Sequence, residues 1–145
     1  SCSMSPKVIE IVQRITARDI PGGTIIFKEG AESTDEMYFV FKGEISIYKI
    51  RDGQPREINR IKPGNFFGEM ALIQSKPRLA TAKVVSESAK LAIIDKPMLL
   101  KLAGSSPEFL FYLLRHAVSR LLIAEDKLQA VREELRNEKL KKGIV

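Results

Sequence analysis

Between Thr24 and Asp95 the chain is a succession of short apolar segments, each closed by glycine or proline. Around Gly43, residues 36–50 alternate apolar and polar side chains, which is the period of a strand with one buried face. Later segments end at the turn residues Asp52-Gly53 and Pro63-Gly64. Short strands of even spacing with such turns predict a mainly β domain: a sandwich, barrel or jelly roll.

Helical patterns flank this β region. Pro6 follows Ser5 and opens residues 7–15, so a serine N-cap and a proline in the first turn predict a short helix. Its expected apolar face consists of Val8, Ile11, Val12 and Ile15. We expect the segment from Ile20 to Gly23 to end it, because proline and two glycines interrupt regular structure.

Two further helices are predicted after Pro97. A short one covers residues 96–104, with Gly104 as its C-terminal stop. The sequence Ser106-Pro107-Glu108 then begins a long helix. Its apolar and small residues recur at alternating steps of four and three: Leu110, Leu114, Ala117, Leu121, Ala124, Leu128, Val131 and Leu135.

A repeat of 3.5 residues is typical of a coiled-coil seam. The first half of this helix fits packing on its own β domain equally well, and Phe109, Phe111 and Leu113 suit that role. Beyond Ala124 little β domain is left to cover, so we expect a partner helix there. The same helix of a second copy is the expected partner, which predicts a homodimer.

The composition describes one soluble globular domain. With 145 residues, 44% apolar and 29% charged, the chain is long enough for a single core. No apolar run is long enough to span a bilayer, and the first residues do not have the pattern of a secretory leader, so we expect none. The one cysteine, Cys2, allows no internal disulfide, which favours the cytoplasm.

The net charge of +6 does not by itself indicate nucleic-acid binding. Basic residues near the C-terminus alternate with acidic ones, as expected of a solvated helix face. We therefore expect neither nucleic acid nor membrane as a partner of this chain alone. The predicted organisation is a possible artificial leader (1–4), a β domain with flanking helices (5–104) and a long helix (105–145).

The segment 66–82 carries the strongest functional signal. Its only charges besides Lys76 are Glu69 and Arg78, set among glycine, alanine and apolar residues. A short helix over 69–73 would leave its first amide groups free for an anion, and an arginine offers paired donors that match phosphate oxygens. A carboxylate cannot bind that phosphate but can accept from a neighbouring hydroxyl. A nucleotide with a small, singly charged phosphate fits this set; an internal Glu69–Arg78 salt bridge is the equally open alternative.

The same segment resembles the phosphate-binding cassette of the cyclic-nucleotide-binding domains. These domains occur in bacterial catabolite-activator regulators, kinase regulatory subunits and nucleotide-gated channels. The matching residues, in order, are Phe67, Gly68, Glu69, Ala71, Leu72, Pro77, Arg78 and Ala80. The resemblance implies an eight-stranded β roll with flanking helices and a C-terminal lid and dimer helix.

The resemblance also implies a role for each cassette residue. Arg78 would pair with the cyclic phosphate, with Ala71, Ala80 and the neighbouring Met70 and Leu79 contributing to the same site. Glu69 would accept from the ribose 2′-hydroxyl, and Gly68 would allow the sugar to come close. The apolar wall for sugar and base would come from Ile47, Ile58 and Ile61.

Leu79 departs from the family pattern. Relatives usually carry alanine, threonine or serine after the arginine, and a hydroxyl there favours guanine in several members. Leucine has no hydroxyl, so cAMP is favoured over cGMP. On the lid helix, Ala124 and Glu125 fall near the adenine position of bacterial relatives, and Arg120 is placed to pair with Glu69. An ordinary exposed helix residue is the favoured explanation for Glu125 and an equally open one for Arg120.

No catalytic or cofactor signature accompanies the cassette. His116 is the only histidine, which excludes a multi-histidine metal site, and on an apolar helix we expect it to be an ordinary packing or surface residue. We therefore predict a sensor that is not an enzyme: it binds a cyclic nucleotide, rearranges its C-terminal helix and signals to a downstream protein. Two alternatives remain open, a nucleotide-free interaction module of the same fold and the truncated effector domain of a DNA-binding regulator.

Overall fold

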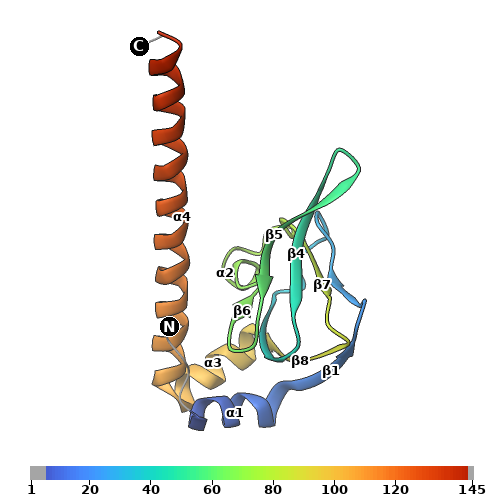
Figure 1. Cartoon of the computed structure of the whole chain (residues 1–145). Helices are drawn as coiled ribbons and strands as arrows, with labels where there is room; N and C mark the ends of the chain where they lie inside the picture. The colour runs from blue at the N-terminus through green and yellow to red at the C-terminus, as the bar shows by residue number, and fades with distance from the viewer. Residues whose placement is uncertain (1–5, 144–145) are drawn as a thin grey trace. The chain divides into compact units, whose positions relative to one another are not determined.

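The computed structural model describes residues 6–143 (Figure 1). The predicted leader 1–4 lies outside these residues, as do the side chains of the apolar face expected for the first helix. The chain divides into two compact units, one extending to Leu110 and the other beginning at Phe111. Each unit is described by itself below.

Two four-stranded antiparallel sheets make up most of the first unit and confirm the predicted eight-stranded β roll. The first sheet has the strand order β1-β8-β3-β6 and the second β2-β7-β4-β5. The strands are β1 (Ala17–Pro21), β2 (Ile25–Phe27), β3 (Glu36–Lys42), β4 (Ile45–Arg51), β5 (Gln54–Ile61), β6 (Phe66–Phe67), β7 (Thr81–Val84) and β8 (Ser88–Asp95). The helices of this unit are α1 (Pro6–Thr16), α2 (Met70–Gln74) and α3 (Lys96–Ser105).

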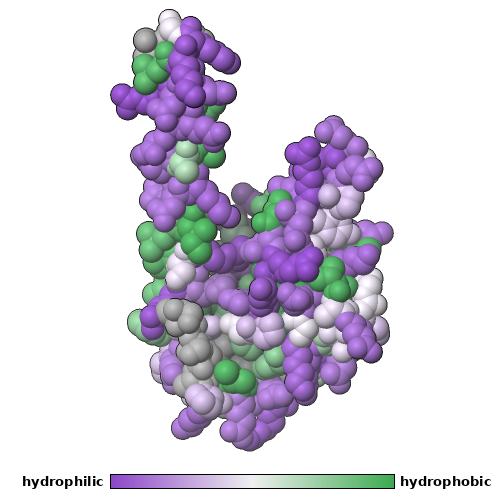
Figure 2. All heavy atoms as spheres, viewed as in Figure 1, coloured by the Kyte–Doolittle hydropathy of each residue, from purple (hydrophilic) through white to green (hydrophobic). Residues whose placement is uncertain are grey.

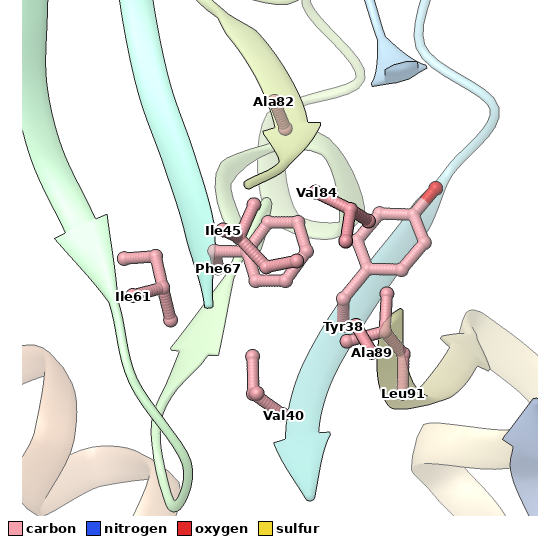
Figure 3. Packing of buried hydrophobic residues seen from close by; sticks show 9 residues of the cluster. All are labelled: Tyr38, Val40, Ile45, Ile61, Phe67, Ala82, Val84, Ala89 and Leu91. Atoms are coloured by element: carbon pink, nitrogen blue, oxygen red, sulfur yellow. The ribbon is translucent and has the colours of Figure 1, made fainter. Parts of the chain in front are cut away.

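The hydrophobic core lies between the two sheets, and Figure 3 shows it from close by. Ile45 illustrates the arrangement: it lies opposite Ile61 on one neighbouring strand and Val84 on the other, and it is fully buried. The first sheet contributes the following buried residues to the same core: Tyr38, Val40, Phe67, Ala89 and Leu91. Each large side chain buried in this way contributes about 1.5–3 kcal/mol.

Strand β3 is buried on both faces. Tyr38 and Val40 point into the roll, whereas Met37 and Phe39 lie on the opposite face of the same sheet and are also buried. That second face is covered by helices: α1 and α3 pack against β8. A chain of aromatic contacts, Phe39 to Phe66 to Phe109, joins the sheet to the first turn of the long helix.

Two turns show why the alternating segments pair as they do. Asp52 and Gly53 both have positive φ angles, 55° and 74°, which is the two-residue hairpin turn whose twist matches the strands. Gly43 (φ +86°) joins β3 to β4, and a side chain there would collide with the backbone of Ser88 and Ala89 on β8.

Three details differ from the sequence-based expectations. Residues 17–21 form strand β1, although only an end of structure was predicted around Pro21. The two-residue strand β6 was not anticipated. Gly104 was wrongly predicted to stop its helix: α3 continues to Ser105, and Ser106 is the extended residue (φ −145°, ψ 92°) at its end.

The long helix α4 (Pro107–Lys141) begins where Pro107 predicts it. Six of the eight seam positions are leucine or valine residues with about half or more of their surface exposed in the single chain: Leu110, Leu114, Leu121, Leu128, Val131 and Leu135. Figure 2 shows hydrophobic surface recurring along α4 between hydrophilic side chains. Within residues 6–143, no helix is both long and apolar enough to cross a membrane.

Replacing Gly43 with alanine is expected to destabilise the roll by roughly 2–4 kcal/mol. The new methyl group would lie 2.9 Å from the Cα of Ala89, in a backbone conformation that side chains disfavour. Gly104→Ala is the matched control, since that glycine is helical with open space around it and alanine should raise stability by about 0.5–1 kcal/mol. Urea unfolding of both variants measures the difference, and equal stabilities would contradict the proposed role of Gly43.

Candidate functional site

The predicted cassette is a turn, a short helix and an extended return to the sheet. Strand β6 pairs with β3, and Gly68 (φ +74°) then turns the chain into α2. The helix α2 confirms the short helix predicted over this stretch and ends at Ser75, a left-handed residue with φ +47°. The backbone therefore needs Gly68 and tolerates strain at Ser75, where side-chain hydrogen bonding compensates.

A hydrogen-bonded clasp holds the end of α2. The Ser75 hydroxyl donates to Asp35 Oδ1 at 2.9 Å, and Asp35 itself has a positive φ of 54°. Ser33 donates to the same carboxylate oxygen and accepts from the Asp35 amide. Two unfavourable backbone conformations thus support each other, and they connect the cassette to the loop between β2 and β3.

The backbone of Arg78 is clamped on both sides to that loop. Its amide donates to the carbonyl of Ala31 at 2.9 Å, and its carbonyl accepts from the amide of Gly30 at 2.7 Å. Next to this pair of bonds, the hydroxyl of Thr81, the first residue of β7, accepts a hydrogen bond from the amide of Glu29 in the same loop. These bonds fix where the Arg78 side chain leaves the chain.

The Arg78 side chain is only 6% exposed. Its Nη1 donates to the Gly68 carbonyl at 3.2 Å, and Nη2 donates to the Glu36 carbonyl at 3.1 Å and more weakly to Thr34 Oγ1 at 3.5 Å. The guanidinium carbon lies 4.1 Å from the centre of the Phe27 ring. Backbone carbonyls and an aromatic face, rather than water, surround the charge.

No carboxylate among the described residues lies within ion-pair distance of Arg78. The salt bridges found in this part of the chain join Arg14 to Glu10, Arg51 to Glu29 and Arg60 to Glu57. The Glu69–Arg78 salt bridge that the sequence left open is therefore not formed. A buried cation without an anion is costly, so the site favours a negatively charged ligand.

Tyr38 is the second buried polar residue beside the guanidinium. Its hydroxyl donates to Glu36 Oε2 at 3.2 Å, and its ring centre lies 5.9 Å from the Arg78 guanidinium carbon. Burial, together with the negative charge of Glu36, raises the pKa of Tyr38 to about 12. Tyr38 therefore stays neutral and adds no negative charge that would compete with an anionic ligand for Arg78.

The cassette residues predicted to bind a ligand lie in one stretch around Arg78. Ala71 and Ala80 are buried, Gly68 and Glu69 are partly exposed, and Met70 is 52% exposed. Leu79 is 66% exposed, immediately after the buried arginine. Met70 and Leu79 therefore present their side chains at the surface, whereas Ala71 and Ala80 do not.

The three isoleucines predicted for the apolar wall occupy different environments. Ile61 is fully in the core and Ile47 packs partly against it, whereas Ile58 is 54% exposed. Ile58 is the extra residue of a β-bulge, since Ile47 pairs with Asn59 and Tyr48 with Glu57. Arg120, Ala124 and Glu125 are exposed residues of α4 in the second unit.

Phe27, Thr34 and Glu36 contribute to the Arg78 site but were not predicted. They precede Arg78 by 42 to 51 positions, and two of the contacts involve a backbone carbonyl and a ring face. Neither feature leaves a spacing or composition signal in a single sequence. The only hint is the placement of an aromatic residue at the end of the strand before Gly30.

Comparison with known proteins places this geometry in a family. The sequence model of the cyclic nucleotide-binding domain matches residues 17–106, which include the whole roll and the cassette. The chain belongs to the cyclic nucleotide-binding domain family. This confirms the resemblance inferred from the cassette, and it identifies the β roll as a binding domain.

Relatives of the domain occur in channels and in kinase regulatory subunits. It is 34% identical over 116 residues to a cyclic nucleotide-gated potassium channel of Rhizobium etli, covering 80% of this chain and 31% of the channel. It is 29% identical over 96 residues to the cAMP-dependent protein kinase type II regulatory subunit of Drosophila melanogaster, covering 66% of this chain and 25% of that subunit. The chain thus spans less than a third of either relative.

Among solved structures, the Thermus thermophilus catabolite activator protein is similar over nearly the whole domain and its long helix. The TM-score is 0.77 at 26% identity, and the match covers 97% of this chain and 70% of that one. The regulatory domain of Toxoplasma gondii protein kinase A, solved with cAMP, matches with a TM-score of 0.56 at 29% identity over 69% of this chain and 38% of that one.

Proposed function

We propose that the domain is a sensor that binds a cyclic nucleotide, with its phosphate on Arg78. The observation that supports this most directly is the buried guanidinium with no carboxylate partner. Its Nε–H donates to none of the described residues, so a donor remains for a phosphate oxygen. The similar Toxoplasma regulatory domain was solved with cAMP, which agrees with this assignment.

The other cassette residues are assigned by their positions around Arg78. Glu69 would accept from the ribose 2′-hydroxyl, and the neighbouring Gly68 would let the sugar come close. Leu79 offers an exposed apolar surface without a hydroxyl, which supports cAMP over cGMP because guanine would lose a hydrogen-bond partner. Ile47 and Ile58 would contact the sugar and base from β4 and the bulge of β5.

The first test is thermal stability with cAMP, cGMP, cyclic di-GMP and, as a control, linear AMP. A ligand at a hundred times its dissociation constant adds about 2.7 kcal/mol, which raises Tm by several degrees for a chain of this size. We expect the largest rise with cAMP and none with AMP. A larger rise with cGMP would reverse the base assignment. No rise with any nucleotide would favour the nucleotide-free interaction module.

Arg78→Lys is expected to weaken cAMP binding roughly 10- to 100-fold, because an ammonium cannot reproduce paired donation to a phosphate. The matched control is Arg60→Lys, an exposed arginine of β5 that pairs with Glu57. Isothermal titration calorimetry of both variants measures the difference. Circular dichroism confirms that each is folded, and unchanged affinity in Arg78→Lys would remove this residue from the site.

The signal is proposed to travel through α4. Between α3 and α4 only Ser106 is extended, so this residue is the natural pivot for a moving helix. A ligand shifts such an equilibrium only if it binds one helix arrangement better than the other. The exposed apolar seam of α4 supports a homodimer in which the two helices pair, and a downstream protein would read their rearrangement.

Leu128→Asp tests the proposed dimer. A carboxylate buried in the seam without a partner costs several kcal/mol, so the dimer dissociation constant should rise at least tenfold. Ile123→Asp is the matched control, because Ile123 is equally exposed but lies off the 3.5-residue seam. Sedimentation velocity should show monomers for Leu128→Asp and dimers for the control. Identical behaviour of the two variants would contradict pairing along this seam.

A further inference from the structure

We infer that Phe27 is a positioning residue for Arg78, with its ring face holding the guanidinium flat at the phosphate site. The importance of this contact for binding rests on the proposed function, although the contact itself does not. Phe27 ends β2, and its ring centre lies 4.1 Å from the Arg78 guanidinium carbon. This distance is well within the range of a cation–π interaction.

The ring is held in place by its own neighbours. Phe27 packs against Tyr38 and Phe67, with ring centres 5.9 and 6.1 Å apart, and those two rings stack on each other at 4.9 Å. A register irregularity between Ile25 and Phe27 in the pairing of β2 with β7 changes which way the Phe27 side chain points. The aromatic surface under Arg78 is therefore supported by the core, against which Phe27 packs.

Face and edge of the guanidinium are constrained separately. The carbonyls of Gly68 and Glu36 accept hydrogen bonds from its two terminal nitrogens, and the Phe27 ring lies under its central carbon. The negative face of the ring also replaces part of the hydration that a cation with 6% exposure has lost. A guanidinium fixed before the ligand arrives saves the ordering cost of binding.

The competing explanation is that Phe27 only fills space. Fluorination distinguishes the cation–π interaction from simple packing, because it withdraws electron density from the ring face with little change of shape. We would incorporate 4-fluoro-, 3,5-difluoro- and 3,4,5-trifluorophenylalanine at position 27 of the full chain. The ligand-free Tm should fall stepwise, by roughly 2–6 °C at the trifluoro variant.

The same series in an Arg78→Met background is the deciding comparison. Without a cation, the stepwise fall of Tm with added fluorine should disappear. If Tm falls equally with fluorine number in both backgrounds, the inference is overturned and Phe27 only fills space. The series at Phe66 serves as a second control, because that ring is fully buried against Phe39 and Phe109. It should show no dependence on Arg78.

Binding of cAMP then tests the positioning role. Phe27→Leu should weaken cAMP binding roughly 3- to 30-fold, because Arg78 is in its binding position in a smaller share of molecules. Phe27→Tyr keeps an aromatic face and should bind with wild-type affinity. Unchanged affinity in Phe27→Leu would refute the role in binding even if the ligand-free slopes are as expected. If wild type binds no cyclic nucleotide, the proposed function fails instead, and the ligand-free comparison still decides the Phe27–Arg78 contact.

Discussion

A guanidinium withdrawn almost completely from water has to be satisfied by protein groups, and this requirement organises one end of the roll. Arg78 draws together segments that are far apart in sequence: the end of β2, the start of β3 and the turn at Gly68. In addition, the Arg78 backbone is hydrogen-bonded to the loop before β3. Because none of these groups carries a full negative charge, the cation is held in position but is not neutralised.

The clasp between Ser75 and Asp35 serves the same arrangement. Asp35 lies directly before Glu36, whose carbonyl accepts from Arg78, and Ser75 ends the helix that follows Gly68. A single hydrogen bond thus spans the two segments that carry the edge contacts of the guanidinium. Left-handed conformations at both residues cost energy, which is accepted at functional sites when the surroundings enforce them.

Much of this fold could be predicted because its signals are local. Alternation around Gly43, the Asp52-Gly53 turn and Pro107 each act within a few residues of themselves. Strand β1 could not be predicted in the same way: its burial pattern is mostly exposed, and it exists because its backbone pairs with β8. Gly104 misled the prediction because glycine permits a helix end without requiring one.

The sequence by itself determined the alternation of strands and turns, the start of the long helix and the cassette in which Gly68, Glu69 and Arg78 follow one another at a recognisable spacing. Only the tertiary structure decided what surrounds Arg78. Whether it met Glu69 or backbone carbonyls, and which ring lay beneath it, depended on contacts across some 40 to 50 residues. Such contacts follow from sheet pairing and core packing, and a backbone carbonyl belongs to every residue, so no side-chain pattern announces them.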